Sequence, residues 1–107
     1  MSQIKMLDII SNKELYQYDY DIHTLEYNVL RYETLPKNEK NEYTRLKLKS
    51  LLKTQKLTAE FCIKYILNDD YAYTDSEEYI TTKEVLIYQK HLSNDDLDKA
   101  HEEFYKP

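Results

Sequence analysis

The side chains that most often carry catalysis or bind metals are sparse in this sequence: His23, His91, His101 and the single cysteine Cys62. A structural zinc site needs several Cys or His at short spacing, and a nucleophile needs an adjacent base. The sequence contains neither pattern. Its 20 acidic residues form many local pairs, but pairs arise by chance at that number. We therefore expect a non-enzyme with no catalytic residue, no cofactor and no metal site.

Glycine is absent from the chain, and this excludes one class of binding loop. Loops that cradle phosphate groups use glycine because it lets the backbone approach the ligand closely. Lys, Asn, Ile and Tyr, whose codons are AT-rich, are abundant. Together with the length of 107 residues and the lack of a metabolic motif, this bias favours a phage or another mobile element as the source.

Residues 45–67 contain the strongest apolar pattern, and we expect the core to form around them. At helical spacing, one face collects Leu48, Leu51, Leu52, Ala59, Cys62, Ile63 and Ile66. Leu57 falls off this face, whereas Thr58 suits an N-cap. The pattern predicts two helices that meet near Gln55, with Cys62 as a small core hydrophobe.

Three capping boxes mark further helix starts, because each has a Ser or Thr followed three residues later by an acid. They pair Ser11 with Glu14, Thr81 with Glu84, and Ser93 with Asp96. We expect helices over residues 11–34, 81–92 and from 93 onward, a short helix over 3–10, and one that opens at Pro36 and ends near 53. The prediction is an all-α compact bundle of about five or six helices in a single domain, 1–107, with a small irregular or hairpin segment near 71–80.

The predicted helix 11–34 carries apolar and aromatic residues on two sides. The first side is an a/d seam of Leu15, Tyr18, Ile22, Leu25, Val29 and Tyr32, which fits packing within a monomer or a homodimer seam. The opposite side aligns Tyr16, Tyr20, His23, Tyr27 and Leu30, flanked by Asp19 and Glu26. Either a further helix covers these tyrosines, or they form an exposed strip of the kind enriched at protein interfaces.

Charge is distributed unevenly along a chain whose net charge is −5. Residues 37–56 hold seven basic and two acidic residues, whereas residues 57–107 hold five and twelve. Arg45, Lys49, Lys53 and Lys56 share one helical face in this prediction. They form either a solvated face that balances nearby acids or a stripe that binds phosphate or acidic groups.

These features favour a non-catalytic protein-binding module, a small regulator or inhibitor that acts as a monomer or homodimer. The chain contains 12 tyrosines, and its acidic, tyrosine-rich surface would dock on a basic host protein. If this surface mimics nucleic acid, the host protein would be one that binds nucleic acid. The expected partner-binding residues are Tyr16, Tyr20, His23, Tyr27, Asp19 and Glu26.

The alternative is a helix-turn-helix or winged-helix DNA-binding regulator that uses residues 37–67. Its recognition helix, 58–67, would lack the base-reading residues Arg, Asn and Gln. No apolar run approaches the roughly 20 residues of a membrane span, and the N-terminal residues do not resemble a signal peptide. We expect a cytoplasmic protein, in the host cytoplasm if a phage encodes it.

Overall fold

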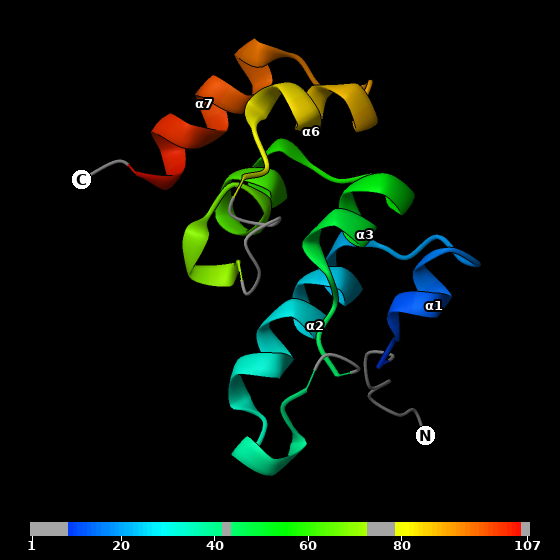
Figure 1. The fold of residues 1–107 in the computed structure, drawn as a ribbon. Coiled ribbons are helices and arrows are strands. Elements are labelled where there is room, and N and C mark those ends of the chain that lie inside the picture. Colours follow the sequence, from blue (N-terminus) through cyan, green and yellow to red (C-terminus); the bar gives the residue numbers. More distant parts are fainter. Residues whose placement is uncertain (1–8, 42–43, 73–78, 106–107) are drawn as a thin grey trace, which may run out of the picture.

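The computed structural model describes residues 9–41, 44–72 and 79–105, and these residues fold into helices and their connections (Figure 1). No strand occurs among them, so the predicted all-α bundle is confirmed. The α-helices within these described residues are α1 (Asn12–Leu15), α2 (Ile22–Thr34), α3 (Leu48–Thr54), α4 (Ala59–Phe61), α6 (Thr82–Tyr88) and α7 (Asn94–Phe104). The π-helical turn η2 (Cys62–Ile66) continues α4, and two 3-10 turns are η1 (Lys37–Glu39) and η3 (Asp69–Tyr71).

The central helices α3 and α4 occupy the middle of the molecule, as the sequence predicts for residues 45–67. Helices α6 and α7 lie at one end and α2 with η1 at the other (Figure 1). One connected core runs through the bundle, and its fully buried side chains include Leu15, Leu25, Leu48, Leu51, Leu52, Leu57, Cys62, Ile66 and Val85. The predicted break at Gln55 and the N-cap at Thr58, whose side chain accepts from the backbone N–H of Phe61, are both confirmed.

The capping residues start their helices where the sequence predicts. Ser11 and Ser93 form complete capping boxes with Glu14 and Asp96. Thr81 accepts from the backbone N–H of Glu84 at 3.2 Å. These bonds satisfy backbone donors that have no partner within their own helix.

Loss of these caps should cost measurable stability. We expect Ser11→Ala, Thr81→Ala and Ser93→Ala each to lower the free energy of unfolding by about 1 kcal/mol, because each leaves a helix N-terminus unpaired. Urea titration followed by circular dichroism measures the change. Thr82→Ala, one residue beyond a cap and exposed, is the control and should stay within about 0.5 kcal/mol of wild type. Three neutral cap variants would contradict the assignment.

The predicted continuous helix over residues 11–34 is wrong, because the chain leaves the helix after Leu15 and re-enters it at Ile22. Two competing interactions explain the break. Asp21 is a better helix start than an interior residue, and its side chain accepts from the backbone N–H of Thr24 at 2.7 Å. The carbonyls of Leu15 and Tyr18 bond to the side chain of Gln55 instead of to the next helical turn.

The predicted helix over residues 37–53 is also wrong, since only α3 is helical beyond the short turn η1. Thr44 and Asn41 bond each other's backbone N–H groups through their side chains, which competes with helix formation. Asn12 holds the next segment: its side chain donates to the carbonyl of Arg45 at 2.8 Å and accepts from the N–H of Lys47 at 2.7 Å. The backbone ahead of α3 is therefore extended.

Helix α6 ends at Tyr88 rather than near residue 92, because the backbone turns at Gln89 and the side chain of Gln89 enters the core. The predicted helix over residues 3–10 lies mostly outside the described residues. The same holds for the predicted irregular or hairpin segment near 71–80, of which 73–78 are not described.

Candidate functional site

Two tyrosines project into solvent from the segment that separates α1 from α2. Tyr16 is 64% exposed and Tyr18 is 59% exposed. We call residues 16–21 the tyrosine bend. The Tyr16 hydroxyl lies 3.3 Å from the Ser50 hydroxyl of α3, and the Tyr18 ring meets the half-buried Tyr20 ring edge-on at 6.3 Å. The bend thus presents two large amphipathic rings beside α3.

The buried side chain of Gln55 holds the tyrosine bend through hydrogen bonds to its backbone. It is 3% exposed and makes three hydrogen bonds to this part of the backbone. Its Nε2 donates to the carbonyls of Leu15 at 2.8 Å and Tyr18 at 2.9 Å, and its Oε1 accepts from the N–H of Tyr20 at 2.9 Å. A segment without glycine is therefore held in one shape by a single carboxamide, and its two exposed rings are positioned in advance of binding.

The predicted strip of Tyr16, Tyr20, His23 and Tyr27 is not continuous, because no single helix carries all four residues. Tyr20 packs partly against the core, and Tyr27 is half-buried on α2. His23 is exposed but lines a different hollow, between α2 and α4. The structure therefore separates Tyr16 from His23 and Tyr27, and of the four aligned residues only Tyr16 and Tyr20 lie in the tyrosine bend.

The two predicted flanking acids also occupy different environments. Asp19 is exposed in the tyrosine bend, beside Tyr18. Glu26 instead accepts a hydrogen bond from the hydroxyl of buried Tyr65 at 2.7 Å. Burial, reinforced by Glu26, raises the pKa of Tyr65 and keeps this hydroxyl as a donor. Glu26 is therefore engaged by Tyr65 within the fold.

Periodicity alone places Tyr18 on the apolar seam, but the structure leaves its side chain exposed. The signal that identifies it is Asp21, because a helix that starts at Asp21 cannot keep Tyr18 on the seam of the preceding helix. The N–H of Thr24, which donates to the Asp21 carboxylate, lowers the pKa of Asp21 below its ordinary value. Asp21 is thus charged at neutral pH and adds to the charge of Asp19 on this surface.

The predicted basic stripe is dispersed in the structure. Arg45 is buried before α3 begins. Lys49 lies 3.6 Å from Glu84 on α6, and the Lys53 ammonium lies 5.8 Å from the centroid of the Tyr88 ring. Lys56 projects elsewhere, into the hollow described next. Lys49 and Lys53 therefore both contact α6 from α3. Of the two, Lys49 lies beside an acid, as expected for a face that balances nearby acids.

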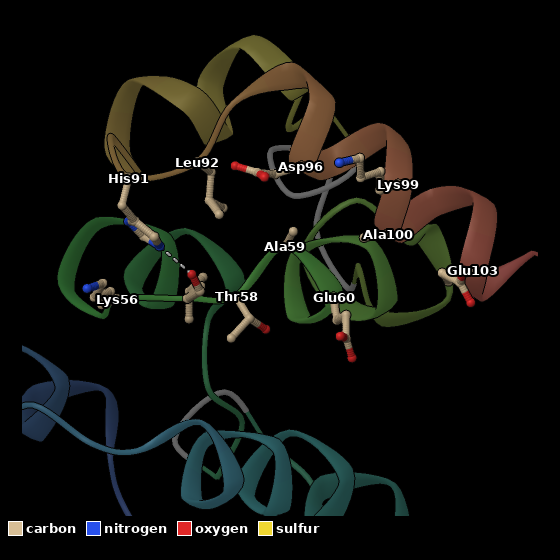
Figure 2. Close-up of a pocket in the computed structure, with 11 residues that line it drawn as sticks. Lys56, Thr58, Ala59, Glu60, His91, Leu92, Asp96, Lys99, Ala100 and Glu103 are labelled. Carbon is tan, nitrogen blue, oxygen red and sulfur yellow. Dashed lines mark hydrogen bonds between the residues drawn. The ribbon is translucent and has the colours of Figure 1, made fainter.

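A hollow of about 550 Å³ lies between the start of α4 and the start of α7 (Figure 2). Its floor is apolar and consists of Leu57, Ala59, Leu92 and Ala100, and charged side chains project along both walls (Figure 2). The Nε2 atom of His91 lies 2.6 Å from the carbonyl oxygen of Leu57 and closes one end (Figure 2). The polar contacts that the lining side chains of Thr58, His91 and Asp96 make are to backbone groups.

The helix that the DNA-binding alternative would use for recognition turns most of its side chains inward. Phe61, Cys62, Ile63, Tyr65 and Ile66 are buried. Glu60 is exposed and Lys64 half-buried, so the surface of this segment offers one acid and one base. The arrangement presents no row of base-reading side chains to a DNA groove.

Cys62 is fully buried, as the sequence predicts, and burial raises the pKa of its thiol from 9.0 to about 12. Burial therefore lowers the thiolate fraction near pH 8 and keeps reagents away from the sulfur. We expect an aromatic disulfide reagent to leave the native protein unmodified over minutes and to titrate one thiol in guanidinium. Rapid reaction of the native protein would show that this part of the core opens.

Residues 9–41, 44–72 and 79–105 contain neither a metal-binding cluster nor a membrane-spanning helix. Within these ranges, no three His, Cys, Asp or Glu side chains lie together as a metal site requires. No helix in the same ranges has the length and apolar character to cross a membrane. Comparison with known proteins finds no matching family model, curated protein or solved structure.

Proposed function

We propose that the chain is a non-catalytic protein-binding module that docks on a basic partner through the tyrosine bend. The observation that supports this proposal is the pair of exposed rings, Tyr16 and Tyr18, on a backbone that Gln55 holds in place. Tyrosine is enriched at protein interfaces because it offers apolar area and a hydroxyl with few rotatable bonds. Pre-ordering of the bend lowers the entropy lost on binding.

The charge around the bend indicates what kind of surface it fits. Asp19 and Asp21 are exposed within it, and Lys13 is the nearest exposed base along the chain. A partner that covers the two rings would bring its own surface against these carboxylates, so a basic patch is complementary. The chain as a whole carries −5, which adds long-range attraction to such a partner.

We infer a role as a small regulator or inhibitor from a phage or other mobile element, acting in the host cytoplasm on a basic, nucleic-acid-binding protein. The size of the chain and its AT-rich coding bias support this origin. DNA binding through residues 37–67 ranks second, because α4 and η2 bury the side chains that would reach the bases.

The proposal predicts a selective loss of affinity when the two rings are removed. We expect Tyr16→Ser with Tyr18→Ser to weaken binding to the captured host protein at least tenfold, or about 1.4 kcal/mol, while the melting temperature changes by only a few degrees. Affinity capture from host extract identifies the partner, and calorimetry with the purified partner measures the constant.

A matched control is the double variant Tyr79→Ser with Tyr105→Ser, which removes two tyrosines that are 76% and 54% exposed elsewhere on the chain. This variant should bind as wild type does. Equal losses from both double variants would show that general tyrosine content, not the bend, supports binding. Unchanged affinity of the Tyr16 and Tyr18 variant would place the interface elsewhere.

A further inference from the structure

The hollow between α4 and α7 continues along α7 as a longer groove. A second hollow of about 580 Å³ adjoins the first and shares Glu60, Ala100 and Glu103 with it. The exposed ring of Phe104 lies at the far end of this second hollow. We call the combined depression the α4–α7 groove. Two small side chains, Ala59 and Ala100, contribute to its floor where α4 and α7 pack together, so the groove has room for another element.

Charges along the two walls of this groove alternate in opposite order. The first charge row is Lys56, Glu60 and Lys64, and the second is Asp96, Lys99 and Glu103. Lys56 and Asp96 line only the first hollow, whereas Lys64 lines the second hollow together with Glu103, so both rows run in the same direction. Figure 2 shows Lys56 on the side of His91 and Glu103 at the opposite end. One wall thus presents base–acid–base, and the facing wall presents acid–base–acid.

These six charges form no ion pair within the described part of the chain, although the Asp96 carboxylate accepts a hydrogen bond from the N–H of Ser93 at 2.9 Å. None of the six has an ion-pair partner within 4.0 Å there, although Glu60 with Lys64 and Lys99 with Glu103 have helical spacing suited to pairing. Five of the six are exposed, and Lys64 is half-buried. An apolar floor between two rows of charges that form no ion pair with each other therefore has the composition of an interface, with an apolar centre and a polar rim.

We propose that the α4–α7 groove binds an amphipathic α-helix of a partner protein. Asp96 and Glu103 are seven residues apart on α7, which is about 10 Å or two helical turns. A partner helix with charges at i, i+3 and i+7 spans the same seven residues. Its apolar stripe lies on Leu57, Ala59, Leu92 and Ala100, and its flanks carry acid–base–acid toward the first row and base–acid–base toward the second. This surface is separate from the tyrosine bend.

Two synthetic helical peptides of identical composition test this proposal. Both carry the same Leu and Ala stripe, three Glu and three Lys. The alternating peptide places Glu-Lys-Glu on one flank and Lys-Glu-Lys on the other, whereas the segregated peptide places three Glu on one flank and three Lys on the other. We expect the alternating peptide to bind the wild-type protein at least tenfold more tightly in fluorescence anisotropy at low salt.

A charge-swapped protein provides the matched control. Glu60→Lys combined with Lys99→Glu leaves net charge and apolar floor unchanged but makes the first row wholly basic and the second wholly acidic. Both residues are exposed, so the fold should persist, which circular dichroism verifies. The preference should then reverse, with the segregated peptide binding at least tenfold more tightly. Equal binding of the peptides, no binding of either, or a preference that does not reverse would overturn the proposal. The proposal would also be overturned if the wild-type chain dimerises and the charge-swapped protein does not, because the groove would then bind a second copy of the chain.

Discussion

Replacing Gln55 with alanine is expected to lower the free energy of unfolding by about 3 kcal/mol, because three backbone groups, one in a buried and two in partly buried hydrogen bonds, lose their partner together. The carbonyls of Leu15 and Tyr18 and the N–H of Tyr20 all bond to this side chain. Their other route to a partner is water, which must enter beside a fully buried Leu15. Urea titration of wild type and variant measures the loss.

The control for this prediction is Gln17→Ala, which removes an exposed glutamine from the tyrosine bend itself. It should change the free energy of unfolding by less than about 0.5 kcal/mol. The Gln55 variant should also weaken binding of the partner beyond any effect of Gln17→Ala, because the bend is no longer held in one shape. If Gln55→Ala were as stable as wild type, the bend would not depend on this carboxamide.

Replacing Gln89 with alanine is expected to have an effect of similar size, about 3 kcal/mol. Gln89 is 2% exposed and holds the connection between α3 and α4. Its Oε1 accepts from the N–H of Leu57 at 2.7 Å, and its Nε2 donates to the carbonyls of Leu52 and Gln55, each at 2.8 Å. The variant leaves three backbone groups unpaired and a cavity in the core.

Gln89→Glu separates the hydrogen bonds from the packing. The carboxylate has nearly the same shape and still accepts from Leu57, but it cannot donate to the two carbonyls when ionised. We expect it to be at least as destabilising as alanine at pH 7, since a buried charge then faces two carbonyl oxygens. A glutamate variant close to wild type in stability would show that packing, rather than hydrogen bonding, is the role of Gln89.

Local patterns in the sequence determined where helices begin and which faces are buried. Ser11, Thr58, Thr81 and Ser93 cap their helices as predicted, because an N-cap bond joins residues only three apart. The apolar face of residues 45–67 is buried for the same reason of local spacing, with Leu48, Leu51 and Leu52 on α3 and Cys62, Ile63 and Ile66 on η2. These signals are sufficient for the all-α class of the fold.

The composition of the docking surfaces depended on contacts between distant parts of the chain. Tyr16 and Tyr18 project together because Gln55 bonds backbone groups 35 to 40 residues earlier in the sequence. The α4–α7 groove forms in the same way, since α7 brings its charge row against residues 56–64 only after packing.

Tertiary structure also decided where two predicted helices break. Gln55 and Asn12 interrupt them by bonding carbonyl and N–H groups that a continuous helix would use itself. In a chain without glycine, the local signals for these breaks are Asp21, which caps α2, and the pair Asn41 and Thr44, whose side chains bond nearby backbone N–H groups. A buried backbone group must find a hydrogen-bond partner, and in the folded chain that partner can be a side chain 40 residues away in the sequence. Helical periodicity, which reflects only nearby residues, cannot predict such a bond.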